Sequence, residues 1–411
     1  MKIFVVSWFY VPITTSEALV TYKLLSSSKF EYYVVSARSN KWSYKKDCKL
    51  ESDNINQIII DTDDFDEFIN TAVSKYEELS KNIKFDAIMT RSFPPECQYA
   101  GFKIKEIDSN IPWIASIADP IANNPYETSQ YLLNSRFKII RNLYYNFPHF
   151  FLKNVCPLIR RPNYQLLSKL NKLENNVLRD ADIIITPNES QAKYIMYDKD
   201  IYDKKSLIVP HSYSAGLYPD IDHNNDRFTF AFIGQSDDLR TVKPIVEAVK
   251  IIKEMNIDIY NKLRIRFIGN IPSYIKDMVY VFFLQDVISV EKPVDYFESL
   301  SIMKSCDVLI HIDAWFNILE NGSIFFAAKI ADYLGAGKPI LGITHSDSPA
   351  GKIINSTGGV TCSNSPYDIA KNIINIMNNP PKLNVEEAKK YDSKNVAKYY
   401  DEELERRIKE L

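Results

Sequence analysis

Short runs of apolar residues recur along the chain, and stretches with helical spacing of apolar and polar positions separate them. The runs are continuously apolar and rich in β-branched and aromatic residues, which is typical of parallel strands that helices cover on both faces. Strand and helix in regular alternation predict a doubly wound α/β sheet. We predict twelve strands, near residues 2–8, 31–37, 57–60, 86–90, 113–117, 182–186, 206–209, 228–234, 263–269, 287–290, 307–312 and 339–343.

Twelve strands are too many for one sheet of this kind, so we predict two Rossmann-like domains facing a central cleft. A polar stretch, DHNNDR at residues 222–227, separates the strands into two groups. We place the N-terminal domain at residues 1–210 and the C-terminal domain at residues 211–385. Residues 386–411 form a charged helix that either lies on the surface or packs back on the N-terminal domain.

The N-terminus, MKIFVVSWFYVPI, combines one lysine with an apolar run, as a secretion signal also does. The Thr-Thr-Ser-Glu that follows lacks the small-residue pattern of a cleavage site, so we predict a buried first strand. No run of about 18 uncharged apolar residues is present, and we therefore expect no membrane-spanning helix.

The composition argues against several kinds of partner and site. A net charge of −2 over 411 residues gives no overall basic field, so no nucleic-acid partner is expected. The five cysteines are scattered and lack CxxC spacing, and the five histidines show no metal-ligand pattern. These features predict a protein of a reducing compartment, the cytoplasm, without a disulfide framework or a metal site.

Two strand ends in the first half carry residues that suit a ligand, because open α/β sheets bind ligands at the carboxyl ends of their strands. Thr14, Thr15 and Ser16 follow the first strand and precede a helix, where they either face an anionic group or cap the helix. The dinucleotide fingerprint GxGxxG is absent there, which argues against an NAD enzyme. Asp119 follows a later strand directly, and it either contacts substrate hydroxyls or shapes the loop as an Asx-turn.

Two strand ends in the second half carry cations. Arg240 and Lys243 open a helix soon after the strand that ends at Gly234. Cations there oppose the helix dipole, so a shared anion would explain them, and ordinary surface charge is the alternative. The segment KIADYLGAGKPIL places Lys329 and Asp332 on one helix face. They either pair with each other or hold a phosphate and a ribose diol.

The segment KIADYLGAGKPIL closely resembles the K-[LI]-x-[ED]-Y-L-x-x-G-K-P-[IV]-[LI] pattern of family 4 glycosyltransferases of the GT-B fold. Four more segments resemble patterns of that family, in the same order and over most of the chain. They are FDAIMTRSFPPECQYAGFKIKEIDSNIPWIASIADP, LENNVLRDADIIITPNESQAKYI, FIGQSDDLRTVKPIVEA and SLSIMKSCDVLIHID. No single motif is decisive, but five in order form a specific signal.

The resemblance implies a retaining hexosyltransferase that needs no metal ion or other cofactor and uses a nucleotide-sugar donor, with a UDP-sugar favoured. It implies a catalytic set of Asp119, Arg240 and Lys329. Asp332 would hold the ribose, and Asp119 with the Thr14–Ser16 turn would face the sugar and the acceptor. The donor-binding set would be Gly234, Gln235, Arg240, Lys243, Glu291, Lys292, Lys329 and Asp332, with Glu291 and Lys292 flanking the base.

The chain departs from the family pattern at three places. Many members carry a glycine pair after the first strand, where this chain has Thr14-Thr15-Ser16. Many carry a glutamate where this chain has Ile324, and Asp332 is one methylene shorter than the family's glutamate. Two alternatives therefore stay open: a catalytically silent homologue that serves as a partner subunit, and a nucleotide-sugar 2-epimerase.

Residues 128–173 contain no Asp or Glu but eight Lys and Arg among aromatic and aliphatic residues. This insert suggests contact with an anionic membrane or the approach path of the acceptor, and a helix pair with a basic face is the alternative. We expect a glycan or lipid-linked acceptor in the biosynthesis of a surface polysaccharide. The protein would then be cytoplasmic, with peripheral contact at the inner face of the membrane.

Overall fold

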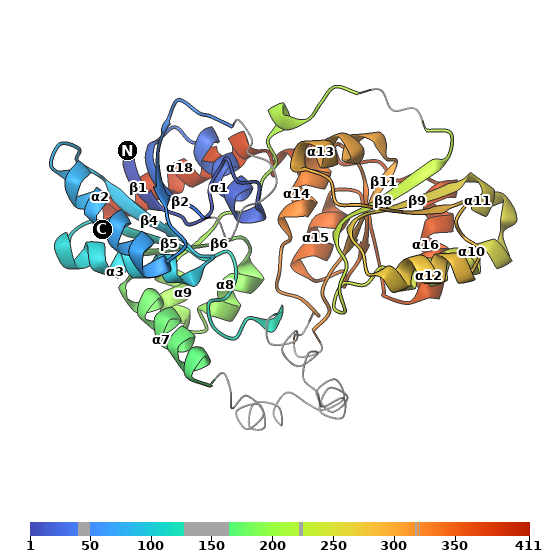
Figure 1. The fold of residues 1–411 in the computed structure, drawn as a ribbon, viewed down its shortest axis with the longest axis horizontal. Helices are drawn as coiled ribbons and strands as arrows, with labels where there is room; N and C mark the ends of the chain where they lie inside the picture. The colour runs from blue at the N-terminus through green and yellow to red at the C-terminus, as the bar shows by residue number, and fades with distance from the viewer. Residues whose placement is uncertain (40–49, 127–163, 222–224, 317–318, 320) are drawn as a thin grey trace. The chain divides into compact units, whose positions relative to one another are not determined.

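The computed structural model describes residues 1–39, 50–126, 164–221, 225–316, 319 and 321–411. These residues form two compact units. The first unit holds the described residues up to Ser212 together with Ser393–Leu411, and the second holds Tyr213–Asp392. Each unit contains one parallel sheet with helices on both faces (Figure 1), so the predicted pair of doubly wound α/β sheets is confirmed.

The first sheet has seven strands in the order β3-β2-β1-β4-β5-β6-β7. The chain builds outward from β1 on one side and from β4 on the other, so the strand order reverses between these two neighbours. Residues 3–6 of β1 are fully buried, as expected of a buried first strand. The strands are β1 (Lys2–Val6), β2 (Glu31–Arg38), β3 (Ile55–Asp61), β4 (Ala87–Arg91), β5 (Trp113–Ser116), β6 (Ile183–Thr186) and β7 (Ser206–Ile208).

Helices cover both faces of the first sheet. The apolar core on one face includes buried residues of α2 (Phe65–Ser80), α3 (Gln98–Ile107), α7 (Tyr164–Asp180) and α8 (Glu189–Ile195). Elsewhere in the unit, α1 (Ser16–Ser27) packs against α18 (Ser393–Glu410), and α9 (Lys199–Lys205) leads into β7. A short 3₁₀ helix, Pro95–Cys97, precedes α3.

The second sheet has six strands in the order β10-β9-β8-β11-β12-β13. Its strand order reverses between β8 and β11. The strands are β8 (Phe228–Gln235), β9 (Leu263–Asn270), β10 (Ile288–Glu291), β11 (Val308–Ile312), β12 (Ile340–Ile343) and β13 (Val360–Cys362). All twelve predicted strands overlap a strand of the structure, but the prediction missed β13, because three residues at a sheet edge give too short a run to recognise.

The two faces of the second sheet have separate cores. One contains residues of α10 (Lys243–Met255), α12 (Ser273–Val281) and α16 (Pro366–Asn378). The other contains residues of α13 (Tyr296–Ser305), α14 (Ala328–Gly335) and α15 (Pro349–Ser356). The unit also holds a 3₁₀ helix, Ala215–Leu217, and α11 (Ile257–Lys262).

The charged C-terminal stretch forms two helices rather than the single helix predicted. α17 (Val385–Lys389) belongs to the second unit, and α18 belongs to the first. The chain leaves helical geometry between them, where the Tyr391 carbonyl accepts a hydrogen bond from the Tyr213 amide and Asp392 forms a bridge with Tyr213. This backbone pairing explains the break, because the same groups cannot also continue a helix.

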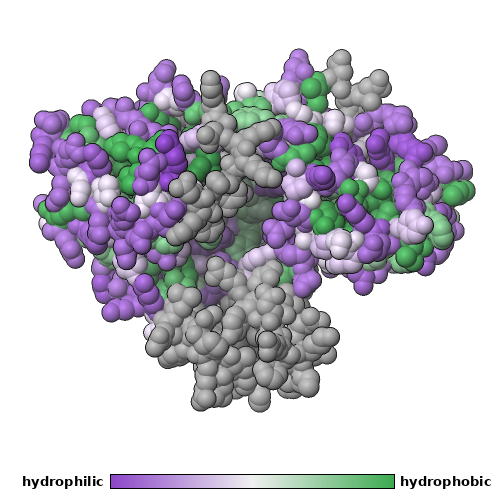
Figure 2. All heavy atoms as spheres, in the orientation of Figure 1, coloured by the Kyte–Doolittle hydropathy of each residue, from purple (hydrophilic) through white to green (hydrophobic). Residues whose placement is uncertain are grey.

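The surface hydropathy and the state of the cysteines are typical of a globular protein. Hydrophilic side chains spread over the viewed face of each unit, with apolar side chains in small groups between them (Figure 2). Among the described residues, none of the helices is both long enough and apolar enough to span a bilayer. Cys97, Cys306 and Cys362 are buried free thiols. Most of the basic insert, residues 128–163, lies outside the described residues.

Candidate functional site

The strands β8 and β11, between which the strand order reverses, pair only at their beginnings and then separate; this separation is called the opening. The register between β8 and β11 pairs Phe230 with Val308 and Ala231 with Leu309, near the start of each strand. Farther along, side chains of α14 bind the backbone of the two strands.

The Tyr333 hydroxyl accepts from the Ile233 amide at 3.4 Å and donates to the Ile310 carbonyl at 3.3 Å. Ligands of open α/β sheets bind at such a point of reversal, outside the carboxyl ends of the strands.

Lys329 lies in the first turn of α14 and reaches this opening. Its ammonium group donates to the Ile233 carbonyl at 2.5 Å. Burial lowers the pKa of Lys329 to about 8, and the charge of Asp332 partly opposes this, while Arg240 adds to it. Gly234 leaves room for the ammonium, since a Cβ there would lie 3.2 Å from the Lys329 Nζ and the backbone has a φ of +154°. The predicted Gly234 therefore matters for close approach.

Arg240 belongs to a tight loop between β8 and α10. The amides of Leu239 and Arg240 both donate to Asp237 Oδ1 at 2.9 Å, and the Asp237 amide donates back to the Arg240 carbonyl at 3.2 Å. The Arg240 guanidinium lies 3.4 Å from Asp237 Oδ2. The positive charge of Arg240 depresses the pKa of both Lys329 and His311, so the two cations act on one region.

Two further predicted residues follow β8. Gln235 ends the strand and is exposed. Lys243 is the first residue of α10, as predicted, but its ammonium lies 3.7 Å from Glu247 one turn along the helix, and its side chain is half exposed. This i,i+4 pair gives Lys243 an ordinary structural partner.

Asp332 lies one turn beyond Lys329 on α14, as predicted, and is buried. Its Oδ1 accepts from the Tyr296 hydroxyl at 3.0 Å, and its backbone carbonyl accepts from the Tyr218 hydroxyl at 2.9 Å. The two glycines that follow have separate roles. A Cβ at Gly335 would collide with Tyr218, whereas Gly337 has a φ of +75° and ends the helix in the left-handed conformation.

Two polar residues that were not among the predicted site residues lie here, His311 in β11 and Asp313 just after it. His311 lies on the same face of the strand as Leu309, which belongs to the core beneath α14. It is 7% exposed, and its Nε2 has no hydrogen-bond partner among the described residues. Burial lowers the pKa of His311 to about 3, helped by Arg240 and Lys329, so the imidazole is neutral. An unpaired buried polar atom costs about 1–3 kcal/mol.

Asp313 follows β11 and shares this region. Its carboxylate accepts from Thr344 at 3.0 Å and from Ser323 at 3.2 Å. Burial raises the pKa of Asp313 to about 6, against the lowering effect of these hydrogen bonds and of Arg240. A signal for both residues was present in DVLIHID, where polar side chains occupy alternate positions of an otherwise apolar strand.

Glu291 and Lys292 lie at the edge of the sheet. Glu291 ends β10, which is separated from β8 by β9. Its carboxylate accepts two hydrogen bonds from Arg266 at 2.8 and 2.7 Å, and these hold the pKa of Glu291 below its usual value. Lys292 is exposed. The structure thus gives Glu291 a bidentate partner within the sheet.

In the first unit, the turn after β1 acts partly as a helix cap. Thr15 is the N-cap of α1, and its hydroxyl accepts from the Ala18 amide at 3.2 Å. Thr14 is half-buried and Ser16 is exposed. The capping interpretation is therefore correct for Thr15.

A buried ion pair lies between α1 and β4. Glu17 accepts from Arg91 at 2.8–2.9 Å, and Arg91 also donates to Ser116 at 2.7 Å. The guanidinium thereby ties α1 to the carboxyl ends of β4 and β5. A hollow of about 20 Å³ beside it has room for little more than a water molecule.

Asp119 is exposed on a bend that follows β5. The chain just beyond this bend is held by Glu174 of α7, which accepts from the Ala122 amide at 2.9 Å. Burial raises the pKa of Glu174 to about 7. The loop that carries Asp119 is thus anchored by a carboxyl group that titrates near neutral pH.

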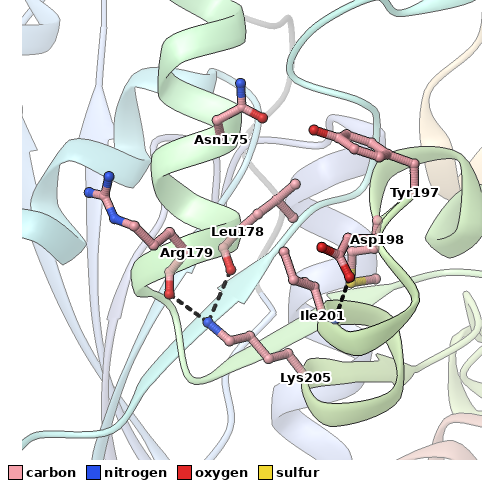
Figure 3. Close-up of a pocket in the computed structure, with 8 residues that line it drawn as sticks. Asn175, Leu178, Arg179, Tyr197, Asp198, Ile201 and Lys205 are labelled. Atoms are coloured by element: carbon pink, nitrogen blue, oxygen red, sulfur yellow. Dashed lines mark hydrogen bonds between the residues drawn. The ribbon is translucent and has the colours of Figure 1, made fainter.

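A larger hollow of about 270 Å³ lies between α7 and α9, beside residues 196–198 (Figure 3). Lys205 crosses it and donates to the carbonyls of Leu178 and Arg179 at 3.0 and 2.6 Å. These carbonyls belong to the last turn of α7, where a cation is favourable. The ammonium therefore caps a helix, which is a structural role.

Comparisons with known proteins bear on the fold. No family model and no curated protein matches the chain. A sucrose-phosphate synthase from Thermosynechococcus elongatus matches over 98% of both chains with a TM-score of 0.64 and 12% identity. The chain has the GT-B fold.

Two other GT-B structures also match. An E. coli trehalose-6-phosphate protein bound with UDP-2-fluoro glucose covers 98% of this chain and 99% of its own, with a TM-score of 0.59 and 11% identity. A UDP-N-acetylglucosamine 2-epimerase covers 98% of this GT-B chain and 94% of its own, with a TM-score of 0.55 and 11% identity. At this identity the likeness concerns the fold alone.

Proposed function

We propose that the second unit of this GT-B protein binds a nucleotide sugar. The proposal rests on the convergence of Arg240 and Lys329 at the opening between β8 and β11. Two cations partly withdrawn from water suit a diphosphate, which carries more than one negative charge. The E. coli protein with UDP-2-fluoro glucose supports this ligand class, because it shares the fold.

We further propose that the protein transfers the sugar to a hydroxyl of a glycan or lipid-linked acceptor. In such a transfer the bond between the anomeric carbon and the diphosphate oxygen breaks, and the acceptor oxygen bonds to that carbon. Negative charge develops on the departing diphosphate, and Arg240 and Lys329 would stabilise it without reorganising. Retention of configuration and independence from metal ions remain parts of the proposal that come from the family resemblance.

The other predicted residues keep their proposed roles. Asp332 would accept hydrogen bonds from the ribose hydroxyls, with Tyr296 fixing the direction of its carboxylate. Glu291 and Lys292 would flank the base, and Gln235 and Lys243 would lie beside the phosphates. Asp119 and the Thr14–Ser16 turn would face the sugar and the acceptor. A role in surface polysaccharide synthesis at the inner face of the membrane completes the proposal.

Thermal unfolding with UDP, GDP, ADP and CMP tests donor binding. A ligand that binds only the folded state raises the melting temperature by mass action. We expect one nucleotide to raise it in the wild type and in the control Lys250→Ala, which changes an exposed lysine near Glu254 on α10. The shift should disappear in Arg240→Ala. If no nucleotide raises the melting temperature of the wild type, the proposal is wrong.

A nucleotide-sugar 2-epimerase is a second candidate, favoured by the structural match to a protein of that activity. An epimerase converts a free UDP-sugar in the absence of any acceptor. Proton NMR of UDP-sugars incubated with the protein alone distinguishes the two candidates. New sugar resonances attached to UDP would indicate epimerisation, whereas an unchanged donor that reacts only after an acceptor is added would indicate transfer.

A further inference from the structure

The His311 imidazole is a buried polar group within an otherwise apolar strand. It lies in the middle strand pair of the second sheet, where the neighbouring positions of β11 are apolar and fully packed. Its side chain is 93% withdrawn from solvent, since only 7% is exposed, and its Nε2 has no hydrogen-bond partner among the described residues. Buried polar atoms in native proteins are paired as a rule, so an unpaired one needs an explanation.

The groups around His311 indicate the charge of a ligand that would suit this position. Arg240, in the loop before α10, and Lys329, on α14, both act electrostatically on the imidazole. Each of the two cations favours an anion nearby and disfavours a proton on His311. A neutral imidazole can still donate one N–H, and its Nε2 can carry that hydrogen.

The backbone places Arg240, Lys329 and His311 near the opening between β8 and β11. His311 is one residue beyond Ile310, whose carbonyl accepts from Tyr333 in the opening between β8 and β11. Lys329 binds the Ile233 carbonyl on the other side of the same opening. An anion that enters between the strand ends therefore approaches Arg240, Lys329 and His311 together.

We infer that His311 donates a hydrogen bond through Nε2 to an oxygen of the phosphate group that Arg240 and Lys329 hold. The inference rests on the proposed nucleotide-sugar site and adds a third, neutral donor to it. The imidazole stays buried and unpaired until the ligand arrives, and ligand binding then satisfies it. His311 would thus improve ligand binding at the expense of the stability of the free protein.

Two variants distinguish the effect of losing the hydrogen-bond donor from the effect of losing the imidazole ring. His311→Leu removes the hydrogen-bond donor and fills the apolar surroundings. His311→Gln keeps an N–H at about the distance of Nε2. His345→Gln is the matched control, because His345 is a partly exposed histidine of the same unit.

Calorimetric titration with UDP and thermal unfolding of the free proteins give the two readouts. We expect His311→Leu to raise the Kd for UDP about ten- to a hundredfold, the usual effect of losing a hydrogen bond to a charged group. His311→Gln and the control should bind within a few-fold of the wild type. Without ligand, His311→Leu should melt at the same temperature as the wild type or higher, which a purely structural histidine would not allow.

Nitrogen NMR of histidine-labelled wild type keeps the test independent of the variants. Titration with inorganic pyrophosphate should shift the His311 Nε2 resonance, while His345 stays unchanged. If UDP binds in an Arg240-dependent way but neither the His311 resonance nor the Kd of His311→Leu changes, the inference is wrong and the donor site stands. If UDP does not bind but pyrophosphate shifts His311, the phosphate contact stands and the proposed function is wrong. If UDP does not bind and pyrophosphate does not shift the His311 resonance, both the inference and the proposed function are wrong.

Discussion

At the residue scale, single charged or titratable groups that are partly buried bind backbone groups at strand and helix ends. Lys329 binds the Ile233 carbonyl, Lys205 binds the last carbonyls of α7, and Glu174 binds the Ala122 amide. Each group loses water when it is buried, and each gains a fixed partner in return. Such residues control local geometry, so their effects should be visible in stability as well as in binding.

Glu174 should make the stability of the first unit depend on pH. Its pKa is about 7 in the folded protein and lies near 4.5 when the chain is unfolded. Below pH 4.5 both states hold the proton, and between pH 4.5 and 7 only the folded state does, so stability falls as pH rises. Glu174→Gln should remove this loss, up to about 3 kcal/mol above pH 7. Urea unfolding of the wild type and Glu174→Gln at pH 5 and pH 8 checks this prediction. If the two proteins differ in unfolding free energy by the same amount at both pH values, the prediction is wrong.

The Glu17–Arg91 pair should show strong coupling. The two side chains are 10% and 5% exposed, so either charge alone would be left buried without its partner. Arg91→Met should cost about 3–5 kcal/mol of unfolding free energy, and the double variant Glu17→Gln/Arg91→Met should cost less than the sum of its single variants. Chemical unfolding of the four proteins measures the coupling, and additive effects would show that the pair is not a unit.

At the element scale, α14 is the helix that organises the candidate site. It supplies Lys329 and Tyr333 to the opening in the sheet and Asp332 to Tyr296. Its end is fixed by two glycines with different tasks. Because three contacts of the candidate site depend on its exact position, small changes at its C-terminus should alter that site.

Substitutions at the two glycines should therefore differ. Gly337→Ala meets no atom within 4 Å and suffers only from its left-handed backbone, which costs about 1–2 kcal/mol. Gly335→Ala collides with Tyr218 and must displace the hydroxyl that binds the Asp332 carbonyl. We expect Gly335→Ala to weaken nucleotide binding and Gly337→Ala to leave it nearly unchanged. Titration with the stabilising nucleotide measures both, and equal losses of affinity would argue against separate roles.

At the scale of the whole molecule, each sheet carries its charged or polar cluster where the strand order reverses. In the first unit this is the Glu17–Arg91 pair beside β1 and β4, and in the second it is Arg240, Lys329 and His311 beside β8 and β11. The first unit also depends on α18, where buried Asp401 accepts from the Ser28 hydroxyl at 2.5 Å and from the Lys29 amide at 2.8 Å. The C-terminal helix is thus hydrogen-bonded to the end of α1.

Asp401→Ala should weaken the first unit alone. Removing the carboxylate leaves two donors unpaired and should cost about 1–3 kcal/mol. Hydrogen exchange should become faster in α1 and α18, while the strands of the second unit keep their protection. Glu402→Ala, at an exposed neighbour, is the matched control. A uniform increase of exchange across both units would contradict this division.

Much of this architecture follows from the sequence, because long apolar runs identify central parallel strands without reference to their partners. The position of Arg240 could be predicted because it follows the end of a strand, and that of Lys329 because it shares a helix face with Asp332. His311 and Asp313 gave only a weak signal in DVLIHID, because alternate polar positions at the end of an apolar strand indicate a site only when their neighbours are known. The ion pair of Glu291 could not be predicted either, because its partner Arg266 comes from another strand. The ligand-binding roles of all the predicted site residues, including Arg240, Lys329 and Asp332, stay predictions.

The return of α18 to the first unit has a consequence for synthesis on the ribosome. All of the second unit, Tyr213–Asp392, is translated before the helix that packs against α1. The second unit can therefore complete its sheet while the face of α1 that α18 contacts is still uncovered. Nascent chains halted before Ser393 should be open to chaperones at α1, and release of the last nineteen residues, Ser393–Leu411, would close that binding surface.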